Sequence, residues 1–267
     1  GSQDVKVQIL ANLVSQLDPL SCRYLVRIPI GILRLGFSDM TVLDAYSWMI
    51  KGDKSLRSVI ERAYHVRPDL GQIGYILKKE GTSGLKKIKP AIFNPILMMR
   101  AERLSSGQEI IEKIGRCAVE YKYDGFRLQV HYKKFQAPTS KIQKNSKSKI
   151  PNHKPNKIQV RLYSRNLEDV SFMYPDVIEG VKKEIKADEI IFEGEAIGFN
   201  PHSGNFLPFQ QTVQRKRKYD IEVKAKEIPL KLFAFELLYL DGKNFLDVPY
   251  IERRRALEKS IKLSKFN

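Results

Sequence analysis

Apolar residues recur at helical spacing through the first third of the chain. After Ser38, a residue type that caps helix N-termini, the side chains of Val42, Tyr46 and Met49 lie three or four positions apart and would share one helical face. Together with proline and glycine at element ends, this spacing predicts helices in four places: near Pro19, from Ser38, over 55–66, and from Pro68 to Gly81. This part is therefore predicted to be a small helical bundle, or part of one.

The periodicity changes after residue 90. Ser106 and Glu109 have the spacing of a capping box ahead of a short helix. Apolar and polar residues then alternate with the period of β-strands in five segments: CAVEYKY (117–123), FRLQVHY (126–132), IQVRLYS (158–164), IIFEGEAIGF (190–199) and LKLFAFELLYL (230–240). We therefore predict an α+β second part built on antiparallel hairpins. The stretch 81–90 contains Gly, Ser, Lys and Pro and is interpreted as a linker, so the predicted domains are 1–88 and 89–267.

A lysine-rich segment interrupts this pattern at 133–157. It holds eight lysines and no acidic residue, and like-charge repulsion and its prolines both oppose a packed core. We expect a loop between two strands. Two interpretations stay open: an additional electrostatic contact to phosphates, or a solvated insertion without a function of its own.

The charge balance narrows the range of partners. The chain has 47 Lys and Arg against 30 Asp and Glu, a formal net charge of +17, which favours a polyanion such as nucleic acid over a membrane surface. Its two cysteines lack metal-ligand spacing, and the sequence has no secretory signal and no apolar run of membrane-spanning length. We therefore expect an intracellular protein of the cytoplasm or nucleoid, or of the nucleus in a eukaryote, with no membrane partner.

The strand predicted at 117–123 carries an unusual row of charges. Glu120, Lys122 and Asp124 would share one face, while Val119 and Tyr121 would face a core. A ladder of compensating charges on a solvated sheet face has the same pattern. The segment alone therefore does not separate a catalytic site from a surface.

Further candidates follow downstream. Glu193 and Glu195 would share one face of an apolar strand, where paired carboxylates are costly unless a cation meets them. Mg²⁺ beside phosphate oxygens is one such cation, and an exposed edge strand is the simpler alternative. Phe233 and Phe235 offer either core packing or a platform for a base. The run QRKRK (214–218), taken alone, indicates a solvated basic surface.

Together these blocks resemble the ATP-dependent DNA ligases of the archaeal and eukaryotic replicative type. Five blocks carry the resemblance: RIPIGILRLGFSDMTVLDAYS (27–47), the K-x-D-G-x-R signature KYDGFR (122–127), YSRNLEDVSFMYPD (163–176), FEGEAIGF (192–199), and LPFQQTVQRKRKYDI (207–221) followed by FAFELLYLDG (233–242). The resemblance implies a multi-domain α and α+β fold. The C-terminal portion of a helical DNA-binding domain would precede an antiparallel-sheet-rich nucleotidyltransferase, or adenylation, domain.

The resemblance implies a nucleotide site. Lys122 would be the nucleophile that becomes adenylated, Glu120 would accept a hydrogen bond from the adenine amino group, and Phe235 would stack on the base. Arg127 matches a nucleotide-contacting arginine, and Glu195 matches a carboxylate that contacts ribose or metal. The implied cofactors are ATP, held as AMP on Lys122, and Mg²⁺.

The resemblance also implies a DNA site. Arg165 matches a nucleotide-contacting arginine and is a candidate for the 5′-phosphate of a nick, and Arg34, Arg215 and Arg217 are the other predicted DNA contacts. Nicked duplex DNA would be the partner, a sliding clamp would bind through parts outside this chain, and the protein would be a monomer. Glu193 stands where the family often has Asp, so its role is left open.

The family pattern continues beyond the end of this chain. A lysine-ending strand, a K-x-K motif and a C-terminal OB-fold domain would follow Asn267 and are absent from the sequence, so we expect a fragment. An RNA ligase or a capping guanylyltransferase would share K-x-D-G, but the helical part and the QRKRK block argue against both. An NAD-dependent ligase would need more zinc-binding cysteines than two. A non-catalytic DNA-binding fragment stays open as an alternative.

We expect the 267-residue chain alone to seal nicked DNA poorly or not at all. The family's missing lysines would contact the α-phosphate, and its OB-fold would orient pyrophosphate and encircle DNA. A multiple-turnover nick-sealing assay on the purified chain measures this, and robust turnover would contradict the expectation.

Overall fold

The computed structural model describes residues 2–29, 36, 38–135 and 157–262. The chain divides into two compact units, Gly1–Glu61 and Arg62–Asn267. This division falls inside helix α4 (Arg57–Val66), so the predicted domain boundary at 88/89 stays a prediction. Most of the lysine-rich segment 133–157 lies outside the described residues. In the described part of the chain, no helix combines the length and apolarity that a membrane crossing requires.

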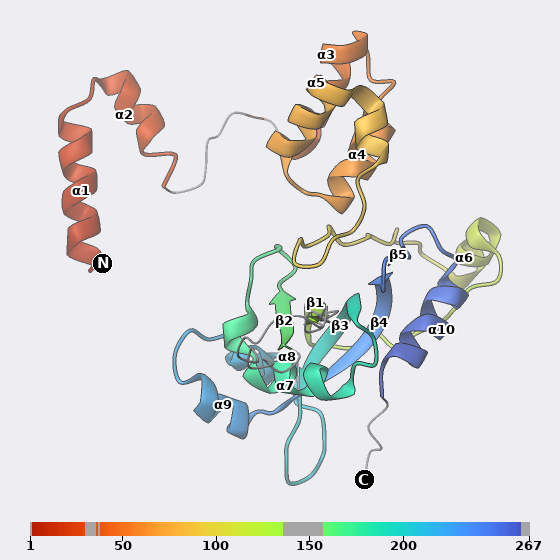
Figure 1. The fold of residues 1–267 in the computed structure, drawn as a ribbon. Helices are drawn as coiled ribbons and strands as arrows, with labels where there is room; N and C mark the ends of the chain where they lie inside the picture. The colour runs from red at the N-terminus through yellow and green to blue at the C-terminus, as the bar shows by residue number, and fades with distance from the viewer. Residues whose placement is uncertain (1, 30–35, 37, 136–156, 263–267) are drawn as a thin grey trace, which may run out of the picture. The chain divides into compact units, whose positions relative to one another are not determined.

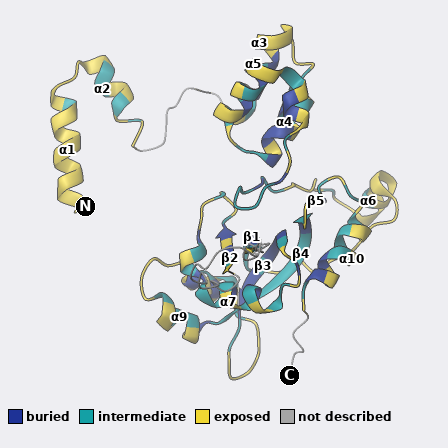
Figure 2. Ribbon diagram, in the orientation of Figure 1, coloured by how far each residue is buried: buried dark blue, intermediate teal, exposed yellow. Residues whose placement is uncertain are grey.

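The first unit is helical, as the spacing predicts. Its helices are α1 (Gln3–Ser15), α2 (Pro19–Leu25), α3 (Asp39–Lys51) and the beginning of α4. The Asp18 carboxylate caps α2 by accepting hydrogen bonds from the backbone N–H groups of Leu20 and Ser21, at 2.9 and 3.1 Å. No described residue of α1 or α2 is buried (Figure 2). These two helices therefore have little packing of their own.

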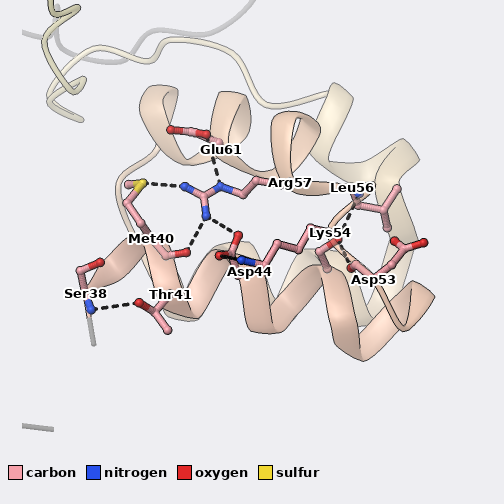
Figure 3. A network of polar contacts seen from close by, with 10 residues as sticks. Ser38, Met40, Thr41, Asp44, Asp53, Lys54, Leu56, Arg57 and Glu61 are labelled. Carbon is pink, nitrogen blue, oxygen red and sulfur yellow. Dashed lines mark hydrogen bonds and ion pairs between the residues drawn. The ribbon is translucent and has the colours of Figure 1, made fainter. Parts of the chain in front are cut away.

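One arginine joins α3 to the start of α4. The Arg57 guanidinium donates to the Met40 carbonyl and to Asp44 on α3, and its Nε–H donates to Glu61 at 3.2 Å (Figure 3). Lys54 forms a second ion pair with Asp44, its Nζ lying 2.9 Å from Oδ2. The hydrogen bonds from Lys54 and then Arg57 lower the pKa of Asp44 below its ordinary value of 3.8.

The second unit begins with helices and continues as a sheet. Its elements are α5 (Leu70–Lys86), α6 (Gly107–Ile114), β1 (Phe126–Phe135), β2 (Lys157–Tyr163), η1 (Ser171–Met173), α7 (Pro175–Glu184), β3 (Glu189–Gly198), α8 (Phe209–Thr212), η2 (Val213–Arg215), α9 (Ile221–Glu227), β4 (Leu230–Leu240), β5 (Lys243–Asn244) and α10 (Tyr250–Ser260). The first half of the predicted linker at 81–90 is largely helical, and its role as a linker stays a prediction. Gly81 departs from helical geometry, with φ 66°, but helix resumes beyond it and ends at Lys86.

The five strands form one antiparallel sheet in the order β2-β1-β3-β4-β5 (Figure 1). On one face, Leu128 and Val130 of β1 belong to a core cluster with Phe192 of β3, Val177 of α7 and Leu257 of α10. Burying an apolar side chain of this size contributes about 1.5–3 kcal/mol. The predicted order of a helical part followed by an antiparallel-sheet part is therefore confirmed.

The opposite face of the sheet carries polar side chains. Because strand side chains alternate, Arg127, Gln129 and His131 point away from the core. In the register of β1 with β3, Glu195 pairs with Arg127 and Glu193 pairs with Gln129. The sheet therefore places two acids and a cation of distant sequence origin on neighbouring strands.

The strand predicted at 117–123 is wrong. The segment has no regular secondary structure, and Val119 and Tyr121 are 94% and 86% exposed instead of facing a core. A strand needs a neighbour for its backbone N–H and C=O groups, and no described strand pairs with this segment. Alternation alone was therefore not sufficient to place these residues in a sheet.

We predict that Arg57→Gln lowers the melting temperature of the helical unit at pH 7. A carboxyl group whose pKa is lowered by folding stabilises the folded state at pH values above its pKa in the unfolded chain. This contribution is lost as the pH falls through the lower pKa of the folded state. The difference from the unchanged chain should therefore shrink as the pH falls below the ordinary Asp pKa of 3.8, and it should be lost once the pH passes the lower pKa of folded Asp44. Fluorescence of Trp48, the single tryptophan, reports unfolding from within α3.

Lys6→Gln, which removes one exposed charge from α1, is the control and should melt like the unchanged chain. Equal melting temperatures for Arg57→Gln and the unchanged chain at pH 7 would contradict the prediction.

Candidate active site

A buried amide organises the polar face of the sheet. The Gln129 Nε2 group donates to the Ile96 carbonyl at 2.9 Å and to Glu193 at 3.2 Å. Its Oε1 atom accepts from the Ile96 N–H at 2.8 Å and from His131 Nε2 at 3.0 Å. Both donor hydrogens and both acceptor lone pairs of the amide are thus used. The segment before the sheet is fixed to β1 by this residue.

The His131 ring is held as the neutral tautomer. Its Nδ1 accepts the Phe93 backbone N–H at 2.9 Å, so the ring proton lies on Nε2 and points to Gln129. Burial lowers the pKa of His131 to about 3, because a charged ring would lose its hydration there. Tyr163 of β2 completes the attachment by donating to the Phe93 carbonyl at 2.9 Å.

Glu193 is neutralised by Arg127. The carboxylate is 3% exposed and accepts a hydrogen bond from the Arg127 guanidinium, as well as the bond from Gln129. The sequence left two interpretations of this acid pair open, a cation such as Mg²⁺ or an exposed edge strand. For Glu193 the structure supports neither Mg²⁺ nor an edge strand, because β3 lies between β1 and β4 and a protein cation, Arg127, meets the charge. The described residues include no group of three or more His, Cys, Asp or Glu side chains placed to hold a metal.

Glu195 has a different environment on the same strand. Burial has the largest effect and raises the pKa of Glu195 above its ordinary value. The hydrogen bond that Glu195 accepts from the Gly125 N–H, and the nearby charges of Lys122 and Arg127, act in the opposite direction. Two predicted site residues, Lys122 and Arg127, thus both lie within electrostatic reach of a third, Glu195. Lys122 itself is exposed, just ahead of the Asp124–Gly125 turn.

Gly125 makes this approach possible. A Cβ atom at this position would lie 2.2 Å from the Ala196 backbone oxygen, closer than any side chain tolerates. Glycine therefore lets the turn after Lys122 lie directly on β3, next to Glu195.

Two phenylalanines of β4 lie beside the lysine segment and its arginine. Phe233 stacks on Tyr123, with ring centroids 4.3 Å apart, and the Arg127 guanidinium lies over the Phe235 ring at 5.1 Å. The register of β3 with β4 shifts between Glu193 and Gly194, which leaves Phe235 as an unpaired bulge residue. Because they are two positions apart on one strand, both rings lie on the polar side of the sheet, near Tyr123 and Arg127.

Residues of α10 contact the carboxylate of Glu120. Its Oε1 atom accepts a hydrogen bond from the Tyr250 hydroxyl and lies 3.9 Å from Arg254 Nη1. The sequence motifs did not predict Tyr250, Gln129 or His131 as site residues. Arg127, Gln129 and His131 do share the polar parity of FRLQVHY, and that signal was available in the sequence.

The predicted DNA contacts separate into three groups. Arg165 is exposed two residues beyond the end of β2, and Arg217 is exposed beyond η2. No hydrogen bond or ion pair joins Arg165 to the other predicted site residues in the part of the chain that is described. Arg34 lies outside the described residues.

Arg215 requires a correction. Its side chain is 1% exposed, donates to Asp176 at 2.6 Å and reaches the Ile228 carbonyl at 3.3 Å. A side chain buried and paired in this way supports the fold and has no free donor surface for a phosphate. The basic run 214–218 thus combines one internal cation with exposed ones.

Two family models match the chain. The DNA ligase N terminus matches residues 1–47, and the ATP dependent DNA ligase domain matches residues 148–266. The chain belongs to the ATP-dependent DNA ligase family. The resemblance found in the sequence motifs is therefore confirmed.

Curated relatives align along nearly the whole of this chain. It is 46% identical to the "Probable DNA ligase" of Dictyoglomus thermophilum, 43% to the DNA ligase of Sulfophobococcus zilligii and 41% to that of Staphylothermus marinus, each over 98% of the chain. The chain spans 39–41% of the length of these relatives. A mycobacterial DNA ligase D complexed with ATP and MES is 26% identical over 54% of this chain and 38% of that chain, with a TM-score of 0.33.

We predict that Arg215→Met lowers the free energy of unfolding of the sheet unit by about 2–4 kcal/mol, because it leaves Asp176 partly buried and unpaired. Chemical denaturation followed by circular dichroism measures this change. Arg215→Met combined with Asp176→Asn should recover part of the loss, since no unpaired charge remains.

Arg217→Met is the matched control, two residues away and exposed. It should change stability by no more than about 0.5 kcal/mol. An Arg215→Met chain with unchanged stability would contradict the structural role of Arg215.

Proposed function

We propose that this chain carries the covalent adenylation step of a DNA ligase. The neutral Lys122 amine attacks the α-phosphorus of ATP, forming a P–N bond as the bond to pyrophosphate breaks. The 5′-phosphate of a nick then attacks the same phosphorus and displaces Lys122, and the 3′-hydroxyl finally attacks the activated 5′-phosphate and releases AMP. Each step transfers a phosphoryl-type group, so alignment and charge neutralisation dominate the catalysis.

The convergence of Lys122, Arg127 and Glu195 around the Gly125 turn supports this proposal most directly. Lys122 is exposed, as a nucleophile must be to reach a phosphate, while the strands behind it hold Arg127. Arg127 Nε–H is buried and has no acceptor among the described residues. An arginine positioned there suits the negative charge that develops on a transferred phosphate.

The adenine base would lie between Glu120 and Phe235. Glu120 offers carboxylate oxygens to the exocyclic amino group, and Phe235 offers a ring beneath the Arg127 guanidinium. A carboxylate acceptor distinguishes an amino group from a carbonyl at the same position, because two acceptors would face each other in the second case.

Mg²⁺ fits as a cofactor that ATP itself helps to bind. Mg²⁺ is usually held by one or two carboxylates together with substrate phosphates and waters, so a dedicated cluster of protein ligands is not required. Glu195 is the proposed protein ligand, because no described residue forms a direct ion pair with it, whereas Glu193 is paired with Arg127. The ion would neutralise charge on the phosphates during transfer.

The proposed macromolecular substrate is nicked duplex DNA. Arg165 and Arg217 are exposed and can meet phosphates, and the net charge of +17 favours a polyanion. We keep Arg34 as a proposed contact from the sequence alone. A monomeric state and a sliding clamp as a further partner stay predictions.

We predict that Lys122→Ala abolishes transfer of label from α-³²P-ATP to the full-length protein in the presence of Mg²⁺. The P–N bond requires the lysine nitrogen, so the labelled adduct should form only when Lys122 is present and should be labile to acid. Gel electrophoresis and autoradiography detect the adduct.

Lys216→Ala, which removes an exposed lysine of the basic run, is the control and should label like the unchanged protein. Equal labelling of Lys122→Ala and the unchanged protein would refute the assignment of Lys122. Binding to nicked DNA without any label on the unchanged protein would favour a non-catalytic DNA-binding role.

A further inference from the structure

Helix α10 contacts both walls of the proposed adenine site. At its first residue, the Tyr250 hydroxyl donates to Glu120. One turn later, Arg253 binds the Glu236 carboxylate through two hydrogen bonds of 2.7 and 2.9 Å. Glu236 is the residue directly after Phe235 on β4, and α10 runs beside that strand (Figure 1). The helix thus links the residue proposed to recognise the base edge to the residue proposed to stack on the base.

Several hydrogen bonds attach α10 to β4. Arg253 also donates to the Val248 carbonyl, and its paired bonds to Glu236 have the bidentate geometry that fixes orientation as well as distance. Arg254 donates to the Ala234 carbonyl at 3.3 Å, and Ala234 directly precedes Phe235. The strand positions on both sides of Phe235 are therefore attached to the same turn of α10.

Glu120 depends on this helix because its own backbone is not in the sheet. The segment 117–123 has no described partner strand, so ladder hydrogen bonds do not fix where its side chains point. The Tyr250 hydrogen bond and the charge of Arg254, 3.9 Å away, both act on Oε1 of Glu120. Oε2 is left to accept a hydrogen bond from a ligand.

Tyr250 remains a donor over the whole working range of pH. Burial, together with the hydrogen bond to Glu120 and the charge of that carboxylate, raises the pKa of Tyr250 to about 12.

We propose that Tyr250 is a positioning residue for adenine recognition, which orients Glu120 from a helix that also anchors the strand of Phe235. This inference rests on the proposed adenylation function. In this proposed role, Tyr250 contacts Glu120 and no reacting atom. Its effect is to hold the free carboxylate oxygen of Glu120 where the exocyclic amino group of ATP can reach it.

The test is base selectivity in lysyl-AMP formation by the full-length protein. kcat/KM is measured for ATP and for purine riboside triphosphate, which lacks only the exocyclic amino group. Tyr250→Phe should reduce the preference for ATP by about three- to tenfold, the range expected for one partly exposed hydrogen bond. The change should appear mainly in the KM for ATP. Because both nucleotides are measured on one preparation, the ratio does not depend on the fraction of protein that is folded.

Tyr239→Phe is the matched control. Its hydroxyl also donates to a glutamate, Glu189 at 2.7 Å, but near the start of β3, away from Glu120. It should leave the selectivity ratio unchanged. Glu120→Gln is the second variant, and it should lose selectivity at least as strongly as Tyr250→Phe.

The outcomes distinguish failure of the role of Tyr250 from failure of the adenylation function on which it rests. A ratio in Tyr250→Phe equal to that of the unchanged protein, or an equal loss with both nucleotides, overturns the role of Tyr250. Selectivity retained in Glu120→Gln overturns it as well, because Tyr250 would then have no base-reading carboxylate to position. An unchanged protein that forms no lysyl-AMP with either nucleotide refutes the adenylation function itself.

Discussion

The ion pair of Arg127 with Glu193 depends on a single buried amide. Gln129 donates to Glu193, and it also forms hydrogen bonds with both the backbone N–H and the C=O of Ile96. These bonds hold together the carboxylate, the sheet and the chain segment that precedes the sheet. Each of these groups would cost about 1–3 kcal/mol if it were buried without a partner. The arrangement in which every donor and acceptor of Gln129 is used is therefore strongly preferred over partial alternatives.

This constraint gives two neighbouring acids of one strand different properties. Glu193 is buried and paired, so it orients Arg127 over the ring of Phe235. Glu195 lies two residues further along the same face, near the turn that follows Lys122, and burial raises its pKa. An alternating strand thus supplies one structural carboxylate and one carboxylate available for chemistry. The difference arises because Glu193 forms an ion pair with Arg127, whereas Glu195 forms no ion pair with any described residue.

The sheet and the helices were predictable because their patterns are local. FRLQVHY and IIFEGEAIGF alternate, and they form adjacent strands whose even-numbered residues enter the core. CAVEYKY alternates equally well but forms no strand, because periodicity indicates which side chains would share a face and not whether a partner strand exists. Arg215 shows the same limit for charge. Within a basic run, the sequence does not distinguish the arginine that turns inward to Asp176 from the exposed arginine two positions later.

By itself, the sequence determined the chemistry that is present and its order: a lysine before an Asp-Gly turn, acids at every second position of a strand, and aromatic residues on the last long strand. These depend only on residue type and short-range spacing. Tertiary structure decided which of these groups meet. Arg127 of β1 pairs with Glu193 of the neighbouring strand β3. Tyr250 donates a hydrogen bond to Glu120, which lies 130 residues away in the sequence. Such pairings follow from register, from a bulge in β4 and from the packing of α10. They are set by the whole fold because burial makes each unpaired charge costly, and that cost cannot be assigned until the neighbours are in place.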